Sequence, residues 1–312
     1  MKYYLILIVG QIFLGLALFT HKIFSRKSDS FLPVGLIYSA LISVFSLPIF
    51  AVLSGFQLSL DKNLLFYSAS YGALAAASQF LIFLALGKVN LVVYSVFSKS
   101  STILVCLCGF IFFNDAVNFG SVTSIILLFA AILIPLFEIK HKEGNKSSLY
   151  SLAICVAIML VGLFIQLVVK GFTELADTST ERASALYFYA NAVTALILLP
   201  AFYLLARKRR FKSDSDNGGN EDFHIGIAET VRKVPSKFYI LIPITATIAN
   251  IPCVTNAYCM MNMDLTIFVV VTKAAESLVY FFISSVIFKE RASRLDLVSL
   301  ALSTLSGIVT VL

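Results

Sequence analysis

Ten apolar runs of about twenty residues divide this sequence, and no other feature constrains the fold as strongly. A run of this length can cross the hydrocarbon core of a bilayer as an α-helix. Only 13% of the residues are charged, whereas a soluble domain carries about 25%. The sequence therefore predicts an all-α polytopic membrane protein with ten transmembrane helices. The runs are Tyr3–Thr20, Leu32–Phe56, Leu64–Leu86, Leu91–Phe113, Phe119–Phe137, Leu149–Val169, Ala183–Ala206, Phe238–Met260, Leu265–Phe288 and Leu295–Leu312.

Basic residues are concentrated in every second connection between these runs. Most of the 24 lysines and arginines fall in the odd-numbered connections, and the rest of the chain outside the runs holds only Lys2, Lys62, Lys170 and Arg182. Positive residues favour the cytoplasmic side of a membrane, so we expect both termini on the outer side. The net charge of +7 then reflects loops that face anionic lipid, and we expect no nucleic-acid partner.

The fourth run contains a lysine near its middle, and the ninth run repeats the pattern. Lys99 lies between serines in the fourth run, and Lys273 occupies the matching position when Asn90 is aligned with Asp264. A lysine at the centre of a membrane helix costs roughly 2.5–3.5 kcal/mol on insertion scales. Such residues usually face a bundle interior or a water-filled cavity, which makes both lysines candidates for a functional site.

The spacing of the two copies predicts how they are arranged. The fourth and ninth runs are five runs apart, so the repeat unit has five helices. An odd number of crossings places the second unit upside down relative to the first. Secondary transporters have inverted repeats of this kind, with the substrate site near the bilayer midplane. The predicted fold is therefore two inverted five-helix repeats.

Each copy also closes on a similar pattern. The fourth run ends in Phe113-Asn114-Asp115 and the ninth in Phe288-Lys289-Glu290-Arg291-Ala292-Ser293, each before a short final run. With the five-plus-five layout, this pattern resembles the drug/metabolite transporter (DMT) superfamily, in its ten-helix branch with two EamA-like repeats. The resemblance implies repeats over residues 1–140 and 148–312. Within the second repeat, the polar composition of residues 207–237 cannot bury apolar area and predicts a mobile loop. Distant similarity to nucleotide-sugar and triose-phosphate carriers implies that Lys99 and Lys273 contact an anionic substrate.

Further candidates come from polar residues inside the apolar runs. Glu276 lies three residues after Lys273, on the same helical face, so the two side chains can neutralise each other. A membrane carboxylate with a raised pKa can alternatively carry a coupled proton. If Lys273 and Glu276 form a pair, Lys99 is left as the uncompensated charge. The other candidate substrate-binding residues are Gln79, Asn250, Asn256 and Tyr94, although interhelical hydrogen bonding is the ordinary use of such amides.

These observations favour one class of function and leave a second open. We expect a secondary transporter that moves a small polar metabolite, anionic or zwitterionic, by alternating access around a midplane cavity. The alternative is a multi-span membrane protein without transport, either a membrane enzyme or a sensor or scaffold. No catalytic or metal-binding motif is present, so we expect neither an enzyme nor a cofactor. We expect the chain in a bacterial plasma (inner) membrane, with a second copy of itself as a candidate partner.

Overall fold

A computed structural model describes residues 2–26, 31–58, 61–86, 91–142, 148–175, 178–214, 236–287 and 294–311. These residues form ten α-helices. The helix labelled α10 continues into a π-helical turn at Ile283–Ile287. The helices are α1 (Lys2–Arg26), α2 (Phe31–Leu53), α3 (Lys62–Leu86), α4 (Leu91–Phe112), α5 (Phe119–Lys142), α6 (Ser148–Thr173), α7 (Thr180–Asp214), α9 (Ser236–Met260), α10 (Leu265–Phe282) and α11 (Arg294–Val311).

Within the described residues, five helices contain stretches that are long and apolar enough to cross a membrane. Large apolar side chains also lie exposed on the outside of the bundle, for example Phe66 and Ile111. Such a surface is unfavourable in water and matches a lipid environment. The helical, apolar character expected of a membrane protein is thus present. The five stretches are Gly35–Leu53, Lys62–Leu84, Val156–Thr173, Thr180–Leu205 and Ile240–Met260.

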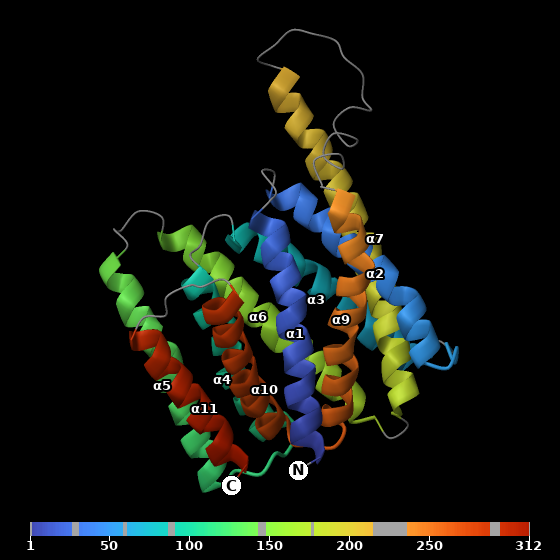
Figure 1. The fold of residues 1–312 in the computed structure, drawn as a ribbon. Coiled ribbons are helices and arrows are strands. Elements are labelled where there is room, and N and C mark those ends of the chain that lie inside the picture. Colours follow the sequence, from blue (N-terminus) through green and yellow to red (C-terminus); the bar gives the residue numbers. More distant parts are fainter. Residues whose placement is uncertain are drawn as a thin grey trace.

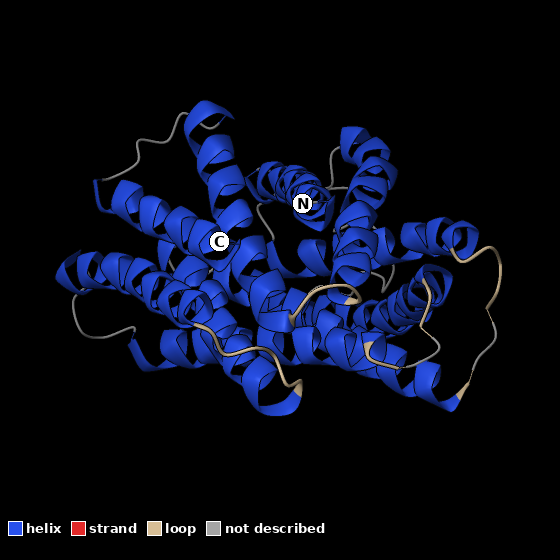
Figure 2. Cartoon of the chain, turned by 90° about the horizontal axis from the view of Figure 1, so that it is seen from below, coloured by secondary structure: helices blue, strands red, loops and turns tan. Residues whose placement is uncertain are grey.

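The helices are arranged with two close pairs at the edges and the others between them (Figure 1). α5 packs on α11 at one edge, and α2 packs on α7 at the other. Both ends of the chain lie at the same end of the bundle, which we call the termini face. Figure 2 shows the bundle from this end, with every described element helical or a short loop.

The packing partners of the first five helices recur among the last five. When α1 to α5 are exchanged in order with α6, α7, α9, α10 and α11, the contact of α1 with α9 becomes that of α6 with α3, and both contacts are present. The same exchange relates α4–α6 to α10–α1, α3–α7 to α9–α2, and α4–α5 to α10–α11. Three contacts map onto themselves: α2–α7, α4–α10 and α5–α11. The contacts of α6 with α9 and of α5 with α10 lack a counterpart of similar extent within the described chain.

Helix α7 is longer than the apolar run that predicts it. Its 35 residues span about 52 Å at 1.5 Å per residue, and its last turns extend beyond the other helices at the end opposite the termini (Figure 1). The expected polar connection at 207–237 therefore begins as a continuation of α7 to Asp214. The remainder of that connection, from 215 to 235, lies outside the described residues.

Three helices that begin at the termini face, α3, α5 and α7, are each capped by the side chain of the residue directly before them. Asp61 accepts a hydrogen bond from the Leu64 N–H (2.7 Å) before α3, and Asn118 accepts one from the Ser121 N–H (2.7 Å) before α5. Ser179 accepts a longer one from the Arg182 N–H (3.2 Å) before α7. These caps satisfy N–H groups that have no partner within the helix. They fix where the helices begin on this face.

Candidate functional site

The lysine and glutamate of α10 form an ion pair inside the bundle. Lys273 Nζ lies 2.6 Å from Glu276 Oε2, and the two side chains are 15% and 8% exposed. Both sit in the middle of a helix of 18 residues that carries no other charged residue. A buried pair of this kind carries a large desolvation cost, and removal of either partner is strongly destabilising. The pair is therefore the strongest electrostatic feature among the described side chains of α10.

The ion pair faces away from the side of α10 that exposes apolar residues. A helix turns about 100° per residue, which places Lys273 about 180° from Phe282 and about 140° from Leu278. Those two apolar residues are 61% and 44% exposed. Ala274 lies against Gly307 of α11, and Val279 lies against Gly15 of α1. Lys273 and Glu276 thus point toward the interior of the bundle.

Helix α1 brings a second polar group to this interior. Gln11, which is fully buried, donates from Nε2 to Asn256 Oδ1 of α9 at 3.2 Å. Glycines allow the close approach of α1: a Cβ on Gly10 would lie 2.3 Å from the Thr255 hydroxyl, and one on Gly15 would lie 2.2 Å from Val279. The predicted candidate Asn256 is thus held by an interhelical hydrogen bond to α1.

The remaining amide candidates are in different settings. Gln79 of α3 accepts a hydrogen bond from the Ser39 hydroxyl of α2 at 3.1 Å, which is the ordinary interhelical use of an amide. Asn250 of α9 is 4% exposed, and its Nδ2 has no hydrogen-bond partner among the described residues. Gln11 Oε1 and Thr102 Oγ1 of α4 are unpartnered in the same sense. Buried polar atoms without partners are rare and are expected to meet water or a ligand.

Two candidates cannot be placed at the level of side chains. Lys99 and Tyr94 lie within α4, but their side chains are outside the described part of the structure. Thr102, one helical turn after Lys99, is fully buried. The backbone places Lys99 on the helix that packs against α6 and α10. Its role in a site therefore remains a prediction.

Two charged residues at the termini face were not among the predicted candidates. The predicted sixth run ends at Val169 and leaves Lys170 in a connection, but α6 continues to Thr173 and the lysine is 5% exposed. Its Nζ donates to the carbonyls of Met260 (3.1 Å) and Met263 (3.4 Å) and pairs with Glu174 Oε1 at 2.5 Å. The i,i+4 spacing of Lys170 and Glu174 was the available signal.

Asp115 is the second of these residues. It appears in the sequence only as part of the closing pattern of the fourth run. In the structure its carboxylate accepts hydrogen bonds from the first turn of α10, at Thr266 N (2.7 Å), Thr266 Oγ1 (2.7 Å) and Leu265 N (3.3 Å). No local pattern could indicate this contact, because the partners are about 150 residues away along the chain.

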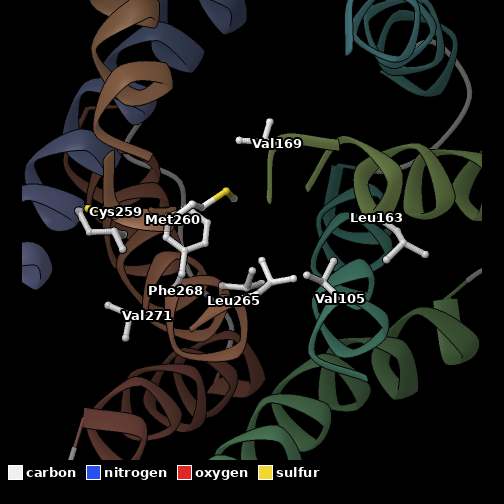
Figure 3. Close-up of a cluster of buried hydrophobic side chains, with 10 residues drawn as sticks. Val105, Leu163, Val169, Cys259, Met260, Leu265, Phe268 and Val271 are labelled. Carbon is white, nitrogen blue, oxygen red and sulfur yellow. The ribbon is translucent and has the colours of Figure 1, made fainter. Parts of the chain in front are cut away.

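An apolar cluster lies beside these charged contacts. Figure 3 shows Val105 of α4 and Leu265 of α10 pointing toward each other, with Phe268 and Met260 beside Leu265. Val105, Leu265 and Phe268 are all fully buried. We call this set the termini-face cluster; it consists of Leu7, Val105, Leu163, Val169, Cys259, Met260, Leu265, Phe268, Val269 and Val271.

Comparisons with known proteins bear on the fold alone. No family profile matches the chain, and no curated protein matches it. A solved structure described only as "Crystal structure of protein" aligns with 99% of this chain and 94% of its own, with a TM-score of 0.66 and 13% sequence identity. The two chains therefore share one fold over nearly their whole lengths.

Proposed function

We propose that the chain is a secondary transporter of the drug/metabolite transporter superfamily, built from two inverted EamA-like repeats. It moves a small polar metabolite, anionic or zwitterionic, across a bacterial plasma membrane. The two repeats comprise the first five and the last five described helices. Transport occurs by alternating access, in which one repeat rocks against the other around a site near the midplane.

The observation that carries this proposal is the matched packing of the two five-helix sets. Nearly every contact of one set has a counterpart under exchange of the sets. Such pairing is expected of a duplicated unit, and an odd number of helices in the unit inverts the second copy. Inverted repeats are the common architecture of secondary transporters.

The charges inside the bundle support a polar substrate. Lys273 and Glu276 neutralise each other at 2.6 Å, and Lys99 is the residue that we expect to attract the anionic group of the substrate. The unpartnered Asn250 Nδ2 of α9 and Thr102 hydroxyl of α4 can donate hydrogen bonds to a carboxylate or phosphate, as a lysine can. The unpartnered Gln11 Oε1 of α1 can accept one from the ammonium group of a zwitterionic substrate.

The first experiment identifies the substrate class and measures flux. Purified protein is screened for thermal stabilisation by amino acids, organic phosphates, sugars and nucleotide sugars, because a bound ligand raises the melting temperature. Compounds that stabilise it are then tested for uptake into proteoliposomes. Saturable uptake supports a transporter. A stabilising ligand that is converted, or that is bound without flux, supports the enzyme or the sensor alternative instead.

Variants then assign the charges. Replacement of Lys99 by alanine should abolish flux and leave the melting temperature near that of the wild type. Lys273→Ala should lower stability by about 3–5 kcal/mol, since the buried Glu276 carboxylate loses its ion pair with Lys273. The exchange Lys273→Glu with Glu276→Lys restores the pair and should recover the fold. Unchanged transport by Lys99→Ala removes Lys99 from the site.

A further inference from the structure

The end of α4 is shaped to place one carboxylate on a distant helix. After Phe112 the chain adopts a left-handed conformation at Asn114 (φ 57°), and the N–H of Asp115 turns back to the carbonyl of Gly109. A left-handed residue commonly ends a helix in this way, and asparagine tolerates it better than most residues. The turn directs the Asp115 side chain toward α10.

Asp115 then acts as the N-terminal cap of α10. Its Oδ2 accepts from both the N–H and the hydroxyl of Thr266 at 2.7 Å, and its Oδ1 accepts from the N–H of Leu265 at 3.3 Å. The residue is 8% exposed. Hydrogen bonds to a carboxylate are stronger than neutral ones, and a negative charge is stabilised at a helix N-terminus.

This cap differs from the others at the termini face in what it connects. Asp61 and Asn118 each cap the helix that follows them in the chain. Asp115 caps a helix of the other five-helix set, although Asp264 stands directly before Leu265 and is placed to do so. The contact therefore ties α4 to α10 across the two sets.

Gly109 provides the room for this contact. A Cβ at this position would lie 2.5 Å from Asp115 Oδ2 and 2.8 Å from Thr266 Oγ1. Any larger residue would thus displace the carboxylate from α10. Gly109, the left-handed Asn114 and Asp115 therefore act together to place the carboxylate on the first turn of α10. We call these three residues the α4–α10 device.

The α4–α10 device lies against the termini-face cluster. Leu265, whose N–H donates to Asp115, is itself part of that cluster and meets Val105 of α4 (Figure 3). Separation of α4 from α10 at this face would expose Val105 and Leu265 and would also break the hydrogen bonds of Asp115. The two events are therefore coupled.

We propose that Asp115 is a latch that holds the termini face of the transporter closed. The inference rests on the proposed function: access from this face requires the Asp115 carboxylate to leave the first turn of α10. Other polar contacts also join the five-helix sets here. Arg182 with Asp61 and the Tyr3 hydroxyl with Asn262 are solvent-exposed, and exposed pairs contribute little. The Tyr189 hydroxyl with the Leu58 carbonyl (2.5 Å) and the Ser306 hydroxyl with the Ser124 carbonyl (2.8 Å) are more buried, but they join uncharged groups. Among these contacts, Asp115 supplies the buried charged group.

Native cysteines report whether the latch is open. Cys106 and Cys259 are free and fully buried, and Cys259 belongs to the termini-face cluster. Sealed vesicles of each orientation are treated with a membrane-impermeant cationic methanethiosulfonate, and modification of each cysteine is quantified by peptide mass spectrometry. In Asp115→Ala, reagent added at the termini face should modify these two thiols about tenfold faster than in the wild type. Reagent at the opposite face should show no such increase.

Matched variants separate a latch from general loosening. Thr266→Val removes the hydroxyl partner from the other side and should also raise the rate. The double variant should be no faster than Asp115→Ala, because both changes break one contact. Asn118→Ala removes a cap in the same connection, within one five-helix set, and should leave the rate unchanged. Cys253, which is partly buried and packs against a different apolar cluster, should react at the same rate in every variant.

The outcomes decide the proposal. A folded Asp115→Ala protein whose Cys106 and Cys259 react at the wild-type rate overturns it, as does an equal increase in Asn118→Ala. If Asp115→Ala does not fold, Asp115→Asn and Thr266→Val provide the same comparison with smaller disturbance. Flux is measured in the same vesicles: faster modification without any flux in the wild type supports the latch and contradicts the transporter. Normal flux in the wild type, together with an unchanged modification rate in Asp115→Ala, supports the transporter and contradicts the latch.

Discussion

Gly109 shows how one residue without a side chain supports a contact between distant parts of the molecule. The oxygen of Asp115 and the hydroxyl of Thr266 both lie within 3 Å of where its Cβ would be. Both groups are held by hydrogen bonds and cannot move without losing them. The requirement for glycine here is thus one of space.

Substitution of Gly109 by alanine should therefore destabilise the protein by about 1–3 kcal/mol, the usual cost of a lost charged hydrogen bond or of overpacking. The chain has no tryptophan, so melting is followed with a maleimide dye that reacts with cysteines as they become exposed. Gly162→Ala is the control, because its Cβ would meet Ser101 at an ordinary 3.4 Å. Equal melting temperatures for the two variants would contradict the assignment.

Lys170 stabilises the end of α9 in the way that Asp115 stabilises the start of α10. A cation near the last carbonyls of a helix is favourable, and this one bonds the carbonyls of Met260 and Met263. We expect Lys170→Met, which keeps the apolar stem, to lower stability by about 1–3 kcal/mol. Glu174→Gln should cost less, since Glu174 is 53% exposed. The dye assay compares the two variants, and a larger loss for Glu174→Gln would place the stabilisation in the ion pair instead.

At the scale of elements, helices that begin at the termini face are capped by polar side chains, and one of these, Asp61, is ionisable. The Leu64 N–H, and after it the Arg182 guanidinium, hold the pKa of Asp61 below its ordinary value. A lowered pKa means that the ionised carboxylate stabilises the folded state above the unfolded pKa of about 3.9. This contribution is lost as the pH falls through the folded pKa.

The wild type should accordingly lose thermal stability on acidification below about pH 4 more steeply than Asp61→Asn. At neutral pH, Asp61→Asn should be slightly less stable, because asparagine keeps the cap but not the charge. Melting temperatures measured between pH 7 and pH 3 give both slopes. Parallel slopes would show that Asp61 makes no contribution that depends on its charge.

At the scale of the whole molecule, each five-helix set packs many of its helices against the other set. The α2–α7 and α5–α11 pairs bury the facing sides of helices from different sets, and Ser306 of α11 donates to the carbonyl of Ser124 of α5 at 2.8 Å. Polar and close-packed contacts of this kind drive helix association in a membrane. Each set alone would leave them unmade.

Two separate chains, 1–145 and 146–312, should therefore assemble when they are expressed together. The break falls in the short connection between α5 and α6, so it interrupts no helix. Co-purification through a tag on one half is the measurement, and each half expressed alone should aggregate or be degraded. A stable, monodisperse single half would show that packing between the sets is dispensable for folding.

The apolar runs determined the helices, because a segment of about twenty apolar residues has few alternatives in a membrane. The sequence also predicted that Glu276 could neutralise Lys273, since residues three apart share a helical face. Helix ends were less predictable: α7 continues to Asp214 through a basic, polar stretch, and α6 includes Lys170. Composition alone does not mark an end where a helix leaves the apolar layer or where a charge is buried.

What only the tertiary structure decided is which polar groups meet. Asp264 stands at the start of α10 in the sequence, yet Asp115 caps that helix from the other five-helix set. Gln11 and Asn256 are 245 residues apart and form one hydrogen bond. Local patterns follow from the period of a helix and the thickness of a bilayer, both of which a sequence displays. Contacts between distant helices depend on how the helices pack, and no spacing along the chain records that.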